Sequence, residues 1–296
     1  MGDAGLTPSM FFDAWELFRT PTLTGTVAAA MLGVLGVYVV LRRMVFLSAA
    51  ISQAAGLGVA LAYLGAVSFG LAGVWASPTL GAAVLTLGAT ALIAADRSAT
   101  SARRDALIGV VYLVGSAGML AVGTRIVQEL QDIDALLFGS AVAVSDADFH
   151  LVSATACAVL AVHALGWRGF SAASFDPDGA QVRGLPVRAL EATLFITLAL
   201  AVSVSTRVLG ALPTFAFSVL PSLAAVRLAP NLPVALLLGG LFGALSGGVG
   251  YLVAFLYEIP VGAAQTLVAA ALVASAELAV RAARLLSRQG LSSSKR

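Results

Sequence analysis

Residues 233–256 read PVALLLGGLFGALSGGVGYLVAFL, a run of 24 residues without one charged side chain. An α-helix rises about 1.5 Å per residue, so about 20 apolar residues cross the roughly 30 Å of hydrocarbon in a bilayer. The run lacks the alternation of apolar and polar residues that marks a strand in a membrane barrel. This stretch therefore predicts a transmembrane helix.

The rest of the chain has the same character. Of its 296 residues, 59% are hydrophobic and 11% are charged, and the mean hydropathy is +0.97. Soluble domains contain about 45–50% apolar and about 25% charged residues. A chain this apolar cannot cover a water-soluble surface, which excludes a cytosolic or secreted enzyme and a disordered scaffold. The single cysteine, Cys157, excludes a disulfide framework and a CxxC metal or redox motif.

Apolar runs of span length recur along the chain. They cover residues 22–41, 55–74, 79–96, 105–124, 148–166, 188–206, 208–228, 233–256 and 260–284. The two runs beside Arg207 nearly merge, so one of them could be a broken or re-entrant helix, and eight spans are as plausible as nine. We predict an all-α, polytopic transmembrane helical bundle that forms one domain over residues 1–296.

Basic residues are distributed unevenly between the two sides of this bundle. With nine spans, one side holds fourteen of the 17 Lys and Arg residues, and the other holds only Arg19, Arg125 and Arg207. Because cytoplasmic loops carry the excess of positive charge, the N-terminus should lie outside and the C-terminus inside. This places an outer segment at 1–20, and a long cytoplasmic loop (167–191) and tail (285–296) inside.

The predicted spans contain few ionisable side chains. Glu277 precedes Arg281 by four residues, a spacing that favours a structural ion pair on one helix face. The sequence shows no HExxH motif, no paired intramembrane carboxylates and no nucleophilic dyad within a span, so we do not expect an enzyme. A secondary transporter would need coupling ionisable groups at mid-membrane, which the sequence also lacks.

Two features of the later spans concern helix packing. Gly239, Gly243 and Gly247 repeat every four residues, so they share one helix face and permit close approach of a second helix. Packing within the bundle is the favoured interpretation, and a contact between subunits is the alternative. Pro213 and Pro221 lie inside one apolar run, where each removes a backbone donor and favours a kink.

The cytoplasmic loop contains FDPDGAQVRGLPVR at residues 175–188. Asp176 followed by Pro177 is typical of a helix N-terminus, and Gly184 followed by Pro186 is typical of a helix end. The pattern predicts a short amphipathic helix that faces the cytosol and suits contact with a soluble partner. A capped connector without a partner fits the same pattern.

Several segments resemble the ABC-3 family, the membrane permeases of bacterial ABC importers for zinc, manganese and iron. The segments are RRMVFLSAAISQAAGLGVALAYL (42–64), RRDALIGVVY (103–112), LLFGSAVAVSDADF (136–149), FDPDGAQVRGLPVR (175–188), VLGALPTFAFSVLPSLAA (208–225) and GALSGGVGYLVAFLYEIPVGA (243–263). Their order along the chain matches the family, and they are spread over most of the chain, from residue 42 to residue 263.

The resemblance implies a multi-pass permease of the bacterial cytoplasmic (inner) membrane that imports a divalent metal ion, zinc or manganese, or a metal chelate. It implies three protein partners: a cytoplasmic ABC ATPase, an extracytoplasmic solute-binding protein and a second permease copy, identical or not. We expect contact with lipid, no nucleic acid and no cofactor, since ATP is used by the ATPase. ATPase docking would fall on Phe175, Asp176, Pro177, Ala180, Arg183 and Gly184.

The sequence departs from the family where the metal should bind. Aligned through the Arg42–Arg43–Met44 motif, Ala49 and Gln53 stand where the family has Asp and His four residues apart. Ala49, Gln53 and Pro221 remain candidates for the translocation pathway, and no metal ligand is retained. The pathway could work without a tight site, the cargo could be a chelate, or a partner could supply the ligands. The alternative function is a degenerate permease that acts as a scaffold or heterodimer partner.

Overall fold

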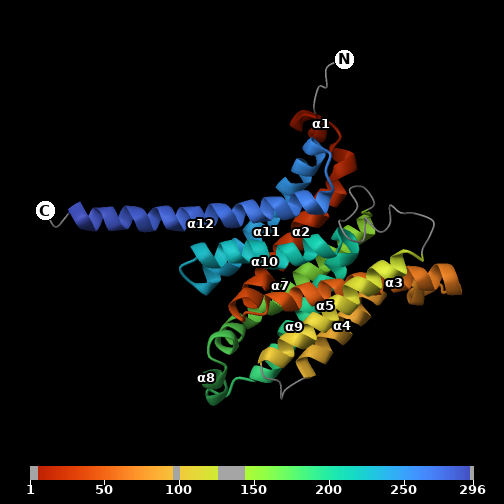
Figure 1. The fold of residues 1–296 in the computed structure, drawn as a ribbon, viewed down its shortest axis with the longest axis horizontal. Coiled ribbons are helices and arrows are strands. Elements are labelled where there is room, and N and C mark those ends of the chain that lie inside the picture. The colour runs from red at the N-terminus through yellow and green to blue at the C-terminus, as the bar shows by residue number, and fades with distance from the viewer. Residues whose placement is uncertain (1–5, 96–100, 126–143, 294–296) are drawn as a thin grey trace.

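The computed structural model describes residues 6–95, 101–125 and 144–293, which contain eleven α-helices, one short 3-10 helix and no strand (Figure 1). The α-helices are α1 (Pro8–Asp13), α2 (Trp15–Leu41), α3 (Val45–Phe69), α4 (Pro78–Ala95), α5 (Ser101–Gly123), α7 (Asp146–Phe175), α8 (Pro177–Val182), α9 (Val187–Leu209), α10 (Ala211–Leu228), α11 (Leu232–Tyr257) and α12 (Val261–Ser293), and the 3-10 helix η1 is Gly73–Ala76. Most of the family-like segment at 136–149 lies outside the described residues.

Nine helices of the described part are long and apolar enough to cross a membrane, which confirms the predicted all-α membrane bundle. The uncertain boundary near Arg207 is a sharp break between α9 and α10 at Gly210. Its backbone has φ 87° and ψ 166°, a region that is essentially restricted to glycine. The two apolar runs are therefore separate helices.

The predicted bounds of one span and of the long loop differ from the structure. The span expected at 55–74 is α3, which begins ten residues earlier at Val45 and ends at Phe69, before the left-handed Gly70. The loop expected at 167–191 is largely helical, because α7 continues to Phe175 and α9 begins at Val187.

The two ends of the chain also differ from expectation. The outer segment predicted at 1–20 contains the short helix α1, but α2 already starts at Trp15 and passes through Pro21 without a break. At the other end, α12 continues from the predicted span into the tail and reaches Ser293.

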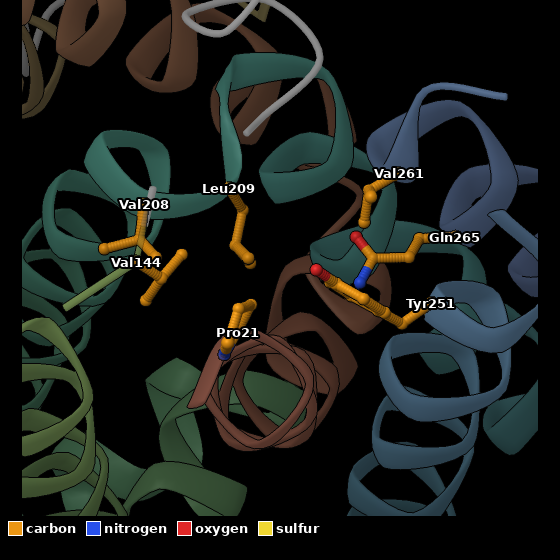
Figure 2. A pocket seen from close by; sticks show the side chains of 7 residues that line it. All are labelled: Pro21, Val144, Val208, Leu209, Tyr251, Val261 and Gln265. Carbon is orange, nitrogen blue, oxygen red and sulfur yellow. The ribbon is translucent and has the colours of Figure 1, made fainter. Parts of the chain in front are cut away.

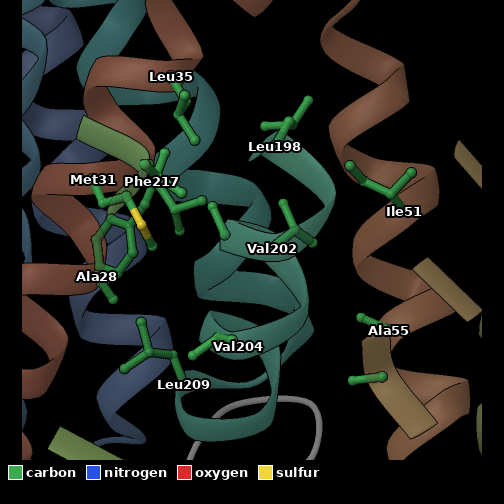
Figure 3. Close-up of a cluster of buried hydrophobic side chains, with 14 of the residues drawn as sticks. Ala28, Met31, Leu35, Ile51, Ala55, Leu198, Val202, Val204, Leu209 and Phe217 are labelled. Atoms are coloured by element: carbon green, nitrogen blue, oxygen red, sulfur yellow. The ribbon is translucent and has the colours of Figure 1, made fainter. Parts of the chain in front are cut away.

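The core lies where α2, α3, α9 and α10 meet. Figure 3 shows Met31, Leu35, Ile51, Leu198 and Phe217 converging from these four helices, and all are nearly inaccessible. By contrast, α4, α5, α11 and α12 expose many large apolar side chains, which is the surface that a bilayer requires. The most buried helices therefore form the centre and the most exposed ones the rim.

Charged groups pair at both ends of the bundle. At the end assigned to the outside, Arg207 lies 2.8 Å from Asp148. At the end assigned to the cytoplasm, Glu277 binds Arg281 at 3.0 Å, which confirms the predicted pair, and it also binds Arg227 of α10 at 2.7 Å. Figure 1 shows α1 and α8, assigned to opposite sides, at opposite ends of the molecule.

Candidate functional site

The predicted docking helix is α8, and its local chemistry fixes its shape. The Asp176 carboxylate accepts a hydrogen bond from the Gly179 N–H at 2.9 Å, so Asp176 is the N-cap that the sequence predicts. A Cβ at Gly179 would collide with that carboxylate. Arg183 Nε donates to the Gly179 carbonyl at 3.0 Å, and Gly184 reverses the chain at φ 80°. The segment is thus a defined, self-capped turn of helix.

The same helix has one anchored side and one exposed side. Ala180 is fully buried, whereas Phe175 and Val182 are 64% and 89% exposed. Sequence reasoning included Phe175 but missed Val182, although an apolar side chain in a polar loop was an available signal. Two exposed apolar groups on this self-capped segment form a surface that a protein partner can cover.

Arg42 joins the helices that carry this docking segment. Its Nε donates to Ser174 Oγ in α7 at 3.0 Å, and its Nη1 donates to Glu191 Oε1 in α9 at 3.4 Å. The Arg42 side chain is 10% exposed. Burial lowers the pKa of Arg42, and the Glu191 carboxylate opposes that shift. This role of Arg42 leaves no signal in the sequence, because both partners are more than 130 residues away in the chain.

The structure brings Ala49 and Gln53 to one face of α3, four residues apart. Ala49 is buried and Gln53 is half-buried, and the amide oxygen of Gln53 is enclosed without a hydrogen-bond partner among the described residues. Gln53 lies against Gly115 of α5, where a Cβ would come within 2.8 Å of the Gln53 backbone. In the part of the chain that the structure describes, no group of three or more His, Cys, Asp or Glu residues could hold a metal ion.

Pro221, the third pathway candidate, lies on α10 rather than α3. Its neighbour Ser222 is fully buried and donates to the Gly33 carbonyl of α2 at 2.8 Å. The helices α3 and α10 approach each other elsewhere, where a Cβ at Gly56 would lie 3.8 Å from Ala211. Pro221 itself is buried inside α10.

The glycine repeat of α11 packs against α2 of the same chain. A Cβ at Gly239 would lie 2.5 Å from the Gly33 carbonyl oxygen, and one at Gly247 would lie 2.7 Å from the Gly25 carbonyl oxygen. A Cβ at Gly243 would collide with the Ala29 carbonyl. The repeat therefore serves packing within the bundle, the interpretation that the sequence favoured over a subunit contact.

A polar cluster at the outer end links three helices. Arg207 of α9 binds Asp148 of α7 and donates to Thr79 Oγ1 of α4 at 2.7 Å. Asp148 also completes a capping box with Ser145, whose hydroxyl accepts from the Asp148 N–H. The sequence analysis assigned Arg207 to the outside but did not predict its partners. The cluster fixes the outer ends of α4, α7 and α9 together.

A small cavity lies between α2, α9, α11 and α12. Figure 2 shows Gln265 and Tyr251 pointing toward it, with Val261 beside Gln265 and with Pro21 and Leu209 on the other side. Gln265 is 1% exposed and donates from Nε2 to the Gly247 carbonyl at 3.0 Å. This bond ties α12 to the glycine repeat of α11, which is a structural role that the sequence analysis missed.

A family model and individual known proteins match most of this chain. A model of the ABC 3 transport family matches residues 14–279. The manganese transport system membrane protein MntC of Halalkalibacterium halodurans is 30% identical over 274 residues, which cover 90% of each chain. The manganese import system permease protein ScaB of Streptococcus parasanguinis is 28% identical over 266 residues, 88% of this chain and 90% of its own.

Among solved structures, PsaBC from Streptococcus pneumoniae in complex with Fab has a similar fold. Its TM-score is 0.79 at 24% sequence identity, and the match covers 91% of this chain and 95% of that chain. The likeness extends over nearly the whole bundle.

Proposed function

Since the chain belongs to the ABC 3 transport family, we propose that it is the permease subunit of an importer that carries manganese(II). It is a multi-pass protein of the bacterial cytoplasmic membrane and a transport permease. The single observation that carries the proposal is the family match over residues 14–279, which includes both the docking segment and α3. Manganese is favoured as cargo because the relatives MntC and ScaB carry that metal in their names.

The chemistry of α3 also favours manganese over zinc. Carboxylate, carbonyl and water oxygens suit Mn²⁺, whereas imidazole and thiolate suit Zn²⁺. With Ala49 and Gln53 at the two positions, the amide oxygen of Gln53 is the ligand that this pair offers, and it is a neutral oxygen. The proposed pathway therefore holds the ion weakly, largely through its own water molecules.

We assign the driving reaction to partner proteins. In the proposed complex, a cytoplasmic ABC ATPase covers α8 through the exposed Phe175 and Val182, and it hydrolyses the ATP. Asp176, Arg183 and Gly184 act by holding the shape of the segment. An extracytoplasmic solute-binding protein delivers the ion, a second permease copy completes the pathway, and this chain needs no cofactor of its own.

One observation favours a second candidate function. Because Ala49 and Gln53 replace both strong ligands, the chain could be a degenerate subunit that supports a partner permease without carrying metal itself. Such a scaffold retains the docking segment and the glycine packing, since neither depends on metal ligands.

The test is the metal content of cells that lack the chain. Manganese, zinc, iron and cobalt are measured by elemental mass spectrometry in deleted and complemented cells grown with limiting manganese. The proposal predicts that deletion selectively lowers manganese and that complementation restores it. Unchanged content of all four metals would refute the importer and support the scaffold.

A further inference from the structure

The polar contacts of Arg42 lie on the two helices that flank the docking segment, α7 and α9. Ser174 is the residue directly before Phe175, at the C-terminal end of α7, and Glu191 lies in the first turns of α9. The Arg42 guanidinium donates to Ser174 Oγ through Nε and to Glu191 through Nη1. A single planar group thus connects the helices that enter and leave α8.

Ser174 is itself held in place. Its hydroxyl donates to the Phe170 carbonyl at 2.6 Å while its oxygen accepts from Arg42. Phe170 is 2% exposed and packs on Tyr38, which precedes Arg42 by one helical turn. Movement of the C-terminal end of α7 would therefore displace Arg42 through the Ser174 hydrogen bond and through the contact between Phe170 and Tyr38.

The backbone on the other side of Arg42 is equally constrained. The amides of Arg42, Arg43 and Met44 donate to carbonyls of the last turn of α2 at 2.9–3.0 Å. Arg43 has φ 56°, so the chain turns sharply and α3 begins at Val45. Ala49 lies in the first turns of α3, shortly after this turn of the chain.

We propose that Arg42 is a positioning residue that transmits movement of the docking segment to α3, the helix that carries Ala49 and Gln53. This inference rests on the proposed function, because it assigns the mechanical link between ATPase docking and the ion pathway. The guanidinium suits the role since its rigid fork of donors holds two partners at once. Its Nη2 is buried and has no partner among the described residues, so a donor is left for a second arrangement.

The test compares ATP hydrolysis with manganese(II) uptake in proteoliposomes that contain the assembled importer. The variants are Arg42→Gln, which removes both contacts, and Ser174→Ala, which removes one with little risk to folding. Arg43→Gln is the matched control, because it removes the same charge from the same turn at an exposed position. ATPase co-purification verifies assembly.

We expect Arg42→Gln to lower the manganese carried per ATP about tenfold while hydrolysis stays within about twofold of wild type. Ser174→Ala should lower the same ratio in the same direction, and Arg43→Gln should leave it unchanged. A merely structural role would lower uptake and hydrolysis together with a constant ratio, and that result would overturn the inference. A wild-type complex without any uptake would instead overturn the proposed function, whereas wild-type uptake with an unaltered ratio in Arg42→Gln overturns the inference alone.

Discussion

The close contact between α11 and α2 offers a quantitative test of the fold. At Gly243 of α11, an added Cβ would lie 2.7 Å from the Ala29 carbonyl carbon and 3.2 Å from the Ala30 Cα of α2. Carbon atoms in good contact are about 3.5–4.0 Å apart, so relief requires roughly 1 Å of separation. The opposing atoms belong to backbone and cannot rotate away. Gly243→Ala must therefore push α2 and α11 apart, and overpacking of this kind costs about 1–3 kcal/mol.

The assay is unfolding in mixed detergent micelles followed by tryptophan fluorescence, which gives the free energy of unfolding for each variant. Gly248→Ala is the control, because it lies on the same helix and its added Cβ meets only the Thr26 hydroxyl at 3.2 Å. We expect Gly243→Ala to lose about 1–3 kcal/mol and Gly248→Ala to lose less than about 1 kcal/mol. Equal stability of the two variants would refute close packing of α11 on α2. A change in oligomeric state alone would reassign the glycine face to a subunit contact.

Three further predictions concern the docking segment, the pathway and the break between α9 and α10. Gly184→Arg, or Asp176→Ala combined with Arg183→Ala, should reduce ATPase co-purification and leave the bundle folded; undiminished co-purification would argue against docking at α8. The double variant Ala49→Asp, Gln53→His should bind manganese(II) with an affinity at least about tenfold higher, measured by calorimetry. The reason is that a carboxylate and an imidazole replace a methyl group and an amide. An unchanged affinity would show that this face of α3 does not meet the ion. Gly210→Ala should cost about 1–3 kcal/mol of unfolding free energy because alanine disfavours φ 87°; wild-type stability would show that the break does not need glycine.

Hydropathy located the apolar helices well and their ends poorly, and α3 shows why. Its first turns carry Ser48, Ser52 and Gln53, which lower the local hydropathy and moved the expected start to residue 55. In the structure, Ser52 Oγ donates to the Ser48 carbonyl within the helix, so this polar side chain is satisfied without ending it. Local hydrogen bonding of this kind leaves no signal in a hydropathy window.

The end of α7 was missed for a different reason. Residues 167–175 look like loop because Trp167, Arg168 and Gly169 interrupt the apolar run. The helix continues because Phe170 stacks on His163 with ring centroids 4.4 Å apart and also packs on Tyr38 of α2. Tertiary packing, which a single-sequence pattern does not contain, thus decides where the loop begins.

The sequence predicted those parts of the candidate site that depend on residues close together in the chain. The Asp176 cap and the turn at Gly184 follow from residue types at fixed spacing, and the glycine repeat of α11 follows from its period. The Arg42 contacts were not predictable, because their partners lie 132 and 149 residues away in the sequence.

The central claim is that residues 175–188 face the cytosol, where the partner ATPase binds them. It is tested most directly by labelling Val182→Cys, in a Cys157→Ala background, with a membrane-impermeant maleimide. We predict no labelling in intact cells, full labelling once the inner face is opened, and protection when the ATPase is bound. Labelling of Val182→Cys in intact cells would contradict the account.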